Sequence, residues 1–393
     1  MSTYGTLKNI FKVIYAPRKA FNEIAQNPKY LGPLIIIVLL VVANIGFAYA
    51  LLSKTYIEQP LPNGSNKDEW TENSTLPWAA TPNAAITDNY NDSINGTDNS
   101  VYGKKSKQFS INDSAQMWMQ LTGIGSIDCL GPDGYKNLSL RIKQISPATS
   151  PSNATIYMLS ATPSDYFYRD LTQYLNPASN IWNNLTVPLG SEGWSSTGTG
   201  ADWSNITGLK LEFTWLDNSN ITVLLDDLFF RGPFKSQLEI YGTSYLLEFP
   251  LLAVMQFVIT WVFISGLTYI ISKGLKGNLI WKPLLIIVGF ILVTMLVQTV
   301  VNAVIYSTSP TVRVPLEYFG TEAEQSIASN AIAEQTWLAS QILRFLQIAV
   351  SIWIIALCSL AVRTLAEFGW AKSILLAAAA YVVTTWLESI LLG

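Results

Sequence analysis

Long apolar runs alternate with polar stretches along this chain, and five runs are long enough to cross ~30 Å of membrane hydrocarbon. They are residues 31–52, 246–271, 284–306, 338–362 and 373–392. The first run begins 30 residues into the chain and lacks a small-residue cleavage pattern, so it predicts a retained span and not a signal peptide. The pattern therefore predicts a membrane protein with an all-α bundle of five transmembrane helices.

The apolar pattern changes between the first two runs, where short β-prone segments follow one another from residue 115 to residue 230. Turn clusters separate them, and polar residues alternate with apolar ones over 209–216, which predicts one wet and one buried face. Four turn residues join this segment to 221–230, which predicts an antiparallel hairpin. We predict an all-β, jelly-roll-like sandwich over 109–234.

The polar stretches at the borders of these regions have their own patterns. Residues 53–108 hold no sustained apolar periodicity and are rich in Asn, Ser, Thr and Pro, which predicts a flexible, glycosylated stalk. Residues 1–30 have helical apolar spacing interrupted at Pro17, with basic residues between, which predicts amphipathic helices on the inner membrane surface. In the loop 307–337, Thr321 and Glu324 predict a capping box that opens a helix toward the fourth span.

All ten Asn-x-Ser/Thr sequons of the chain lie between residues 63 and 220. The alternative to glycosylation is that an Asn- and Thr-rich segment produces the tripeptide by chance. Their confinement to one region favours a domain exposed to a glycosylation machinery. The predicted acceptors are Asn63, Asn73, Asn91, Asn95, Asn112, Asn137, Asn153, Asn184, Asn205 and Asn220.

The distribution of basic residues predicts the same orientation independently of the sequons. Residues 1–30 carry five Lys or Arg against one acid, and the 272–283 loop carries three Lys and no acid. The 307–337 loop carries one Arg against four Glu. Because cytoplasmic loops are enriched in Lys and Arg, we predict a cell-membrane protein with a cytoplasmic N-terminus. Residues 53–245 and the C-terminus would then be extracellular.

Composition narrows the function classes. Half of the residues are hydrophobic, 13% are charged and the net charge is −3, so nothing supports a nucleic-acid partner. The chain has no His, and no arrangement of Ser or Cys with a base is readable, so we expect no enzyme activity. Cys129 and Cys358 lie in different regions and are not expected to pair. A glycosylated, acidic ectodomain without a disulfide is typical of an archaeal-like cell surface.

Five polar residues stand out within the predicted spans. Gln341, Arg344 and Gln347 recur every three residues on one helical stripe, and the carboxylates of two other spans lie at a similar depth. Snorkelling of the Arg344 side chain to nearby headgroups is one interpretation. A buried ion pair of Arg344 with Glu248 or Glu388 is the second, and a polar site within the bundle is the third.

A proline- and glycine-marked segment precedes the first span. Its marked positions are Pro17, Ala20, Phe21, Ile24, Pro28, Gly32 and Pro33. This segment resembles the start of the Yip family of Ypt/Rab-interacting-type membrane proteins, and the resemblance covers about residues 5–52 and 246–393. It implies a five-helix membrane domain with a cytoplasmic N-terminus. The domain inserted after the first span departs from that family, and no GTPase-related role is carried over.

The sequences around Trp182, Trp194 and Trp203, together with the step Asp226-Asp227-Leu228, resemble galactose-binding-like sandwiches of the carbohydrate-binding-module type. The resemblance implies a structural calcium near Asp226 or Asp227. Successive strand residues face opposite sides, so these two carboxylates cannot both chelate one ion. Tryptophans in a sandwich usually pack in the core, as the phase of Trp215 predicts. Trp194 and Trp203 are the candidates for stacking on a sugar.

Three functional hypotheses follow. The first is a non-enzymatic membrane protein that displays a glycosylated β-sandwich outside the cell for binding glycan or a cell-surface protein. The second is an accessory subunit of a larger membrane complex, with the sandwich packed on a partner. The third is a transporter or membrane enzyme with a polar site around Arg344. The lipid bilayer is a partner in all three.

Overall fold

The computed structural model describes residues 3–62, 68–73, 77–94, 102–162, 164–176 and 178–391. The chain divides into two compact units. The helical unit comprises residues 1–56, 236–312 and 333–393, and the sandwich unit comprises 57–235 and 313–332. The sandwich unit is therefore larger than the predicted 109–234, because segments on both sides of that range fold with it.

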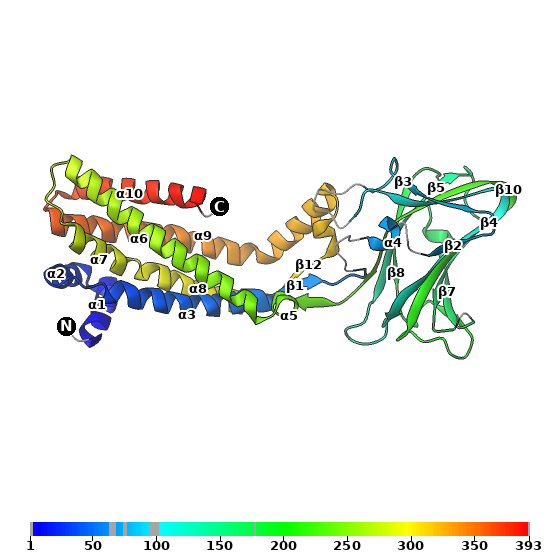
Figure 1. Ribbon diagram of the computed structural model, residues 1–393, viewed down its shortest axis with the longest axis horizontal. Helices are drawn as coiled ribbons and strands as arrows, with labels where there is room; N and C mark the ends of the chain where they lie inside the picture. The colour runs from blue at the N-terminus through cyan, green and yellow to red at the C-terminus, as the bar shows by residue number, and fades with distance from the viewer. Residues whose placement is uncertain are drawn as a thin grey trace. The chain divides into compact units, whose positions relative to one another are not determined.

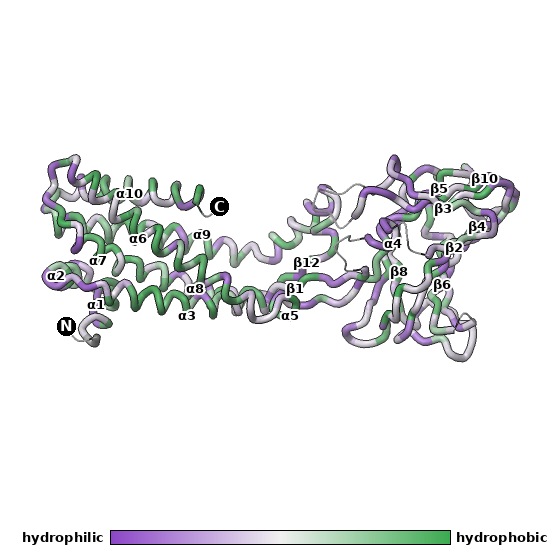
Figure 2. Tube along the Cα trace, viewed as in Figure 1, coloured by the Kyte–Doolittle hydropathy of each residue, from purple (hydrophilic) through white to green (hydrophobic). Residues whose placement is uncertain are grey.

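The helical unit contains all the predicted apolar runs. Within the described part of the chain, five helical stretches are long and apolar enough to cross a membrane, which confirms the number predicted from the sequence (Figure 2). They are α3 (Leu31–Lys54), η2 with α6 (Thr243–Leu247 and Glu248–Gly274), α7 with α8 (Trp281–Ile291 and Val293–Thr308), α9 (Glu322–Ala366) and α10 (Trp370–Leu391). A short α5 (Gln237–Tyr241) precedes η2. The third stretch is broken at Leu292, between α7 and α8.

The predicted amphipathic segment forms α1 (Thr3–Tyr15) and α2 (Pro17–Gln26), which meet at Pro17 (Figure 1). Their apolar side chains join the core of the helical unit instead of all facing outward, and Phe21 is fully buried. The segment Gly32-Pro33 also packs closely, because a Cβ on Gly32 would overlap the ring of Phe290. The motif ahead of the first span therefore sets a close approach between α3 and α7.

The sandwich unit has two sheet layers that share the long strands β4 (Ser106–Ile127) and β10 (Ile206–Arg231). One layer has the order β3, β4, β10, β5, β8, and the other β2, β4, β10, β6, β7, β9. The shorter strands are β2 (Trp78–Ala80), β3 (Ala85–Asn89), β5 (Asn137–Ser146), β6 (Asn153–Leu159), β7 (Tyr166–Asp170), β8 (Trp182–Pro188) and β9 (Ser195–Thr197). This pairing makes a β-sandwich.

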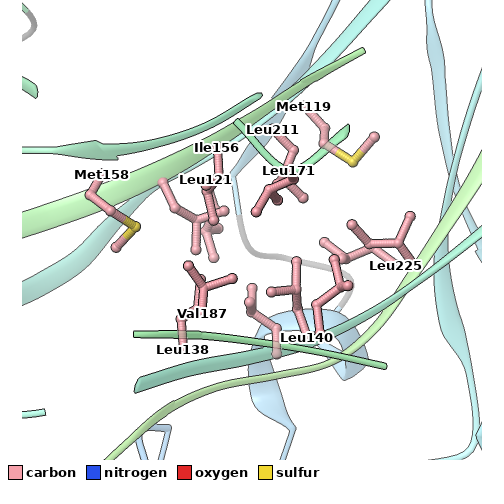
Figure 3. Packing of buried hydrophobic residues seen from close by; sticks show 14 of the residues in the cluster. Met119, Leu121, Leu138, Leu140, Ile156, Met158, Leu171, Val187, Leu211 and Leu225 are labelled. Carbon is pink, nitrogen blue, oxygen red and sulfur yellow. The ribbon is translucent and has the colours of Figure 1, made fainter. Parts of the chain in front are cut away.

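One hydrophobic core fills the space between the two layers. Figure 3 shows Met119, Ile156 and Leu211 from one layer near Leu140 and Leu225 from the other. The alternation predicted over 209–216 is confirmed as far as Trp215, since the apolar residues of 209–215 are buried and the polar ones are not, whereas Leu216 is 88% exposed. Burial of apolar side chains on both layers provides the main stabilisation of this unit.

The predicted hairpin at residues 217–220 is wrong. β10 runs without a reversal from Ile206 to Arg231, and both halves pair with β4. The turn-prone residues lie at register shifts between Thr214 and Ile221, where β10 passes from one layer to the other. Bulges of this kind use polar residues and irregular backbone without ending a strand, so the local composition is the same as for a turn.

The predicted flexible stalk over 53–108 is wrong for the described residues of that range. They form β1 (Thr55–Glu58), α4 (Glu69–Glu72), β2, β3 and the start of β4. Trp70 and Trp78 are buried in the sandwich core, and Trp78 Nε1 donates to the carbonyl oxygen of Trp70 at 2.9 Å. Single aromatic side chains attach this segment to the sandwich core, so its sequence shows no apolar periodicity.

The loop between α8 and α9 also contributes to the sandwich unit, through η3 (Leu316–Phe319) and the first turns of α9. The capping box is confirmed. Thr321 N donates to Glu324 Oε2 at 3.0 Å, and Glu324 N donates to Thr321 Oγ1 at 3.4 Å. The nearby β12 (Val312–Val314) lies in a three-stranded sheet of order β11, β1, β12, in which β11 is Phe234–Ser236.

Candidate functional site

Aromatic side chains gather on the outer side of the layer formed by β4, β10, β6 and β7. This aromatic face comprises Trp118, Tyr157, Tyr166, Tyr168 and Lys210. The register puts them on one side, because Lys210 lies opposite Tyr157 and Tyr157 lies opposite Tyr168. The residues that alternate with them belong to the buried core.

The members of the aromatic face contact one another directly. Lys210 Nζ lies 5.4 Å from the ring centroid of Trp118 and 5.0 Å from that of Tyr157. The ring centroids of Tyr157 and Tyr166 are 5.5 Å apart, and those of Tyr157 and Tyr168 are 6.3 Å apart. Tyr168 is 39% exposed and the other rings are half-buried, so the rings are held in place yet open on one side.

Polar groups lie between the rings. Glu212 Oε2 lies 2.5 Å from Lys210 Nζ, and Glu212 Oε1 accepts a hydrogen bond from Gln116 Nε2 at 2.6 Å. Burial, followed by the charge of Glu212, raises the pKa of Tyr157, so its hydroxyl stays protonated at neutral pH. A rigid aromatic surface with an ammonium, a carboxylate and hydroxyl donors can stack on a sugar ring and bind its hydroxyls.

The sequence contained a signal for this face, although sequence reasoning missed it. The strand residues next to Trp118, Tyr157 and Tyr168 include apolar residues of the core. Period-two alternation therefore places these three aromatic side chains on the side of each strand that faces away from the core. The tryptophans of residues 182–215, which stand out in the sequence, lie outside this face. Only the register aligns the side chains of β4, β10, β6 and β7.

The prediction that Trp203 stacks on a sugar is wrong, because Trp203 is only 5% exposed. Its ring stacks on Phe167 at 4.2 Å between centroids. Trp194 is half-buried, packs edge-on against Trp203 at 5.2 Å, and donates from Nε1 to the carbonyl oxygen of Pro188 at 2.8 Å. Trp215 is buried in the core, as its phase predicts. A sugar-binding role for Trp194 stays a prediction.

The outer side of the other layer is covered by the chain itself. This covered face carries Arg141 on β5, whose Nε lies 2.8 Å from Asp227 Oδ2 and whose Nη2 donates to Glu324 Oε1. The Arg141 guanidinium lies 4.6 Å from the ring centroid of Tyr102. Burial raises the pKa of the Tyr102 hydroxyl, and the nearby Asp227 raises it further. The four residues of this cluster come from four separate parts of the chain.

A second ion-pair network on the sandwich unit involves Arg231 at the end of β10. Arg231 Nε and Nη2 contact both carboxylate oxygens of Glu58, at 3.0 and 2.5 Å. Arg231 Nη2 also donates to Glu317 Oε2 at 2.9 Å, and the Leu316 amide donates to Glu58 Oε2 at 2.9 Å. The bidentate geometry holds the loop after α8 on the sandwich.

The two adjacent aspartates of β10 make different contacts, at a register shift between Asp226 and Phe229 that interrupts the regular alternation of the strand. Asp227 has a φ of 55° and points toward Arg141, whereas Asp226 Oδ2 accepts from the Ile94 amide at 2.7 Å. Thr71 Oγ1 donates to Asp68 Oδ2 at 2.5 Å and lies 3.5 Å from Asp226 Oδ1. The Thr71 hydroxyl therefore lies between the carboxylates of Asp226 and Asp68, which come from distant segments of the chain.

Burial raises the pKa of Asp68 to about 7, and burial with the Asp68 charge raises that of Asp226 to about 8. Asp68 Oδ1 is buried without a hydrogen-bond partner. Among the described residues no three acidic, His or Cys groups converge on a metal position. The pair and the Thr71 hydroxyl nevertheless fit a divalent cation in charge and ligand type. Because Ca²⁺ takes ~6–8 oxygens, backbone carbonyls or water would have to supply the rest.

The predicted glycosylation sites lie mainly on the surface of the sandwich unit. Within the described part of the chain, the exposed acceptors are Asn91, Asn112, Asn153, Asn184 and Asn220. The half-buried acceptors are Asn73, Asn137 and Asn205. Asn63 and Asn95 lie outside the described residues. Glycosylation itself stays a prediction, and exposure leaves five of these positions open to it.

The polar residues of the predicted spans do not converge on one site. Arg344 and Glu248 are both exposed, and neither is in a salt bridge among the residues that the structure describes. Glu388 accepts a hydrogen bond from Thr260 Oγ1, and Gln347 accepts one from Gln298. Gln341 is half-buried. This arrangement favours the interpretation of Arg344 as a snorkelling side chain over the buried ion pair.

No family model matches the chain, and no curated protein matches it. The resemblance to the Yip family therefore stays a prediction.

Solved structures similar to the chain include carbohydrate-binding modules. One is described as a carbohydrate-binding module from the β-sandwich superfamily, with 12% identity and a TM-score of 0.30, covering 44% of this chain and 62% of that one. A β-1,2-glucanase from Parabacteroides distasonis has 15% identity and a TM-score of 0.28, covering 39% and 22%. A family 11 module from Clostridium thermocellum with a bound tetrasaccharide has 12% identity and a TM-score of 0.29, covering 44% and 94%.

The chain thus spans less than two thirds of the first two of these structures. TM-scores near 0.3 carry no functional weight, so the side chains of this protein must supply the support for a function.

Proposed function

We propose that this chain is a non-enzymatic, multi-pass membrane protein that binds glycan on the aromatic face of its β-sandwich. The observation that carries the proposal is the continuous surface of Trp118, Tyr157, Tyr166 and Tyr168 around Lys210. Amphipathic rings that are fixed by their neighbours lose little conformational freedom on binding, and the interspersed polar groups bind hydroxyls.

The location of the sandwich is part of the proposal. The N-terminus is cytoplasmic, and the sandwich and the C-terminus are extracellular. Two features of the sequence support this orientation: all sequons lie between residues 63 and 220, and the loops assigned to the cytoplasm are rich in Lys. Glycans at the exposed acceptors are expected on the same side.

The aromatic face also bears on the alternative of a complex subunit. A surface that packs on a permanent protein partner is more apolar than average and depleted of charged residues at its centre. Lys210 and Glu212 lie at the middle of the aromatic face, between Trp118 and Tyr157. Glycan binding is therefore the better-supported function of this surface.

The test uses the full-length protein in lipid nanodiscs on an array of neutral and acidic oligosaccharides. Wild type should bind a subset of glycans, and Tyr157→Ala and Tyr168→Ala should each weaken that binding at least about tenfold. Tyr90→Ala is the matched control, because Tyr90 is 67% exposed and lies over Lys105, outside the aromatic face. Absence of any glycan binding, or equal binding by all three variants, would contradict the proposal.

A further inference from the structure

A cavity of about 360 Å³ follows strand β8 on the side of the sandwich that faces β7 and η1 (Thr172–Tyr174). Its lining is Arg169, Leu171 and Tyr174 on one side and residues 184–188 of β8 on the other. The volume is at the small end of the ~300–1,000 Å³ range of ligand sites. The cavity is separate from the aromatic face, since none of the residues of that face line it.

Hydrogen bonds hold both rims of this cavity. The Asn176 amide donates to Asn183 Oδ1 at 2.6 Å, which fixes the segment after η1 to β8. Trp194 Nε1 donates to the carbonyl oxygen of Pro188 at 2.8 Å, which fixes the loop before β9 to the other end of β8. The cavity is therefore preformed, and an occupant need not order its walls.

The lining presents groups suited to a sugar. Tyr174 is 49% exposed, and its ring centroid lies 6.0 Å from the Arg169 guanidinium. Arg169 Nη2 donates to the Tyr174 hydroxyl at 3.5 Å. A tyrosine ring provides a flat apolar surface, and a guanidinium provides several donors to hydroxyl or carboxylate oxygens.

All three residues of the sequon Asn184-Leu185-Thr186 line the same cavity. We propose that the glycan attached to Asn184 folds back into this cavity, with its first sugars on Tyr174 and their oxygens hydrogen-bonded to Arg169. The Asn184 side chain is exposed, so it can carry the glycan without repacking. The cavity is then an intramolecular binding site for the protein's own modification.

The bound glycan has a physical consequence for the edge of the sheet. Among the described residues β8 pairs with β5 alone, so no strand covers its other edge. Open edges of this kind associate with strands of other molecules unless something covers them. A glycan in the cavity covers the edge along residues 184–188. The inference goes beyond glycan binding by the aromatic face and requires only that Asn184 be glycosylated.

The test measures amide hydrogen exchange in peptides covering residues 166–188 of the full-length protein, purified from cells that glycosylate it. Thr186→Ala removes the sequon, and Thr186→Ser keeps it as the matched control. Thr186→Ala should speed exchange in these peptides about three- to tenfold, whereas Thr186→Ser should exchange like wild type. Asn112→Gln, which removes an exposed sequon that does not line this cavity, should leave these peptides unchanged.

Tyr174→Ala distinguishes glycan binding from a purely structural role of the cavity wall. With the glycan still attached, Tyr174→Ala should speed exchange to a similar extent, and combining it with Thr186→Ala should add little. A bare Asn184 in wild-type glycopeptides would overturn the inference. Exchange unaffected by loss of the glycan, or fully additive effects of the two changes, would overturn it as well. The aromatic-face variants test the proposed function separately.

Discussion

The two outer faces of the same sandwich differ in how far their charged side chains are buried. On the covered face, Arg141 and Asp227 are about nine-tenths buried, and residues from separate parts of the chain enclose them. On the aromatic face, Lys210 and Glu212 lie among rings that stay open on one side. Charges on both sides form close ion pairs, but the side chains of Lys210 and Glu212 are 24% and 19% exposed, against 9% and 6% for those of Arg141 and Asp227.

This difference separates structural charges from charges that are available to a ligand. A buried ion pair is expensive to break, because the charge left behind has lost its hydration. A pair that water still reaches contributes less to stability, since water replaces part of the lost interaction. The covered face should therefore respond to mutation through stability, and the aromatic face through binding. Four predictions test this contrast, from the largest expected effect to the smallest.

Arg141→Met should destabilise the sandwich most. The substitution leaves the buried Asp227 carboxylate without its cation, which costs ~3–5 kcal/mol in unfolding free energy. Lys210→Met on the aromatic face should cost less than this, because water reaches the Glu212 carboxylate that is left behind. Unfolding of the full-length protein followed by β-type circular dichroism measures both. Adding Asp227→Asn to Arg141→Met should recover part of the loss, and equal effects of Arg141→Met and Lys210→Met would break the comparison.

Trp118→Ala should have the opposite signature, with weakened glycan binding and a nearly unchanged free energy of unfolding. We expect binding to fall by about ten- to a hundredfold, as for an anchor residue at the centre of an interface. Titration of the glycan found on the array against full-length protein in nanodiscs gives the affinity. A large loss of stability in this variant would assign Trp118 to the core and contradict the open character of the aromatic face.

Lowering the pH from 8.5 to 6 should stabilise the sandwich when no divalent cation is present. The pKa values of Asp68 and Asp226 are raised in the folded state, to about 7 and about 8, so folding favours their protonated forms. The stability they provide is present below the unfolded pKa and is lost as the pH rises through the folded values. The melting temperature as a function of pH measures the effect, and Asp68→Asn should flatten the curve.

Calcium provides the control for that pH dependence. If the Asp68–Asp226 pair holds Ca²⁺, added Ca²⁺ should raise the melting temperature more at pH 8.5 than at pH 6, because protons and the cation compete. A chelator should reverse the increase. No response to Ca²⁺ at either pH would mean that a shared proton alone neutralises the pair.

The smallest effect is expected at Cys129. Burial raises the pKa of its thiol to about 12, and its side chain packs in the sandwich core. Alkylating reagents at pH 8 should therefore modify Cys129 only after unfolding, and reducing agents should not shift the melting temperature. Mass spectrometry of native and denatured protein checks the reaction. Rapid modification of the native protein would show that the core opens more readily than its packing indicates.

The sequence by itself determined the features that depend on local pattern. The five apolar runs predict the helices because a span requires a continuous apolar surface of known length. Alternation over 209–216 predicts the buried side of β10, and Thr321 with Glu324 predicts the start of α9. Each of these signals involves residues that are near neighbours in the chain.

Only the tertiary structure decided how distant segments combine. Asp68 meets Asp226, and Glu58 and Glu317 meet on Arg231, across separations that no periodicity encodes. The polar step at 217–220 became a passage between layers, because β4 continues opposite both halves of β10. The aromatic face exists only through the register of four strands. Pattern predicts which side of an element is buried, whereas long-range packing decides what lies against it.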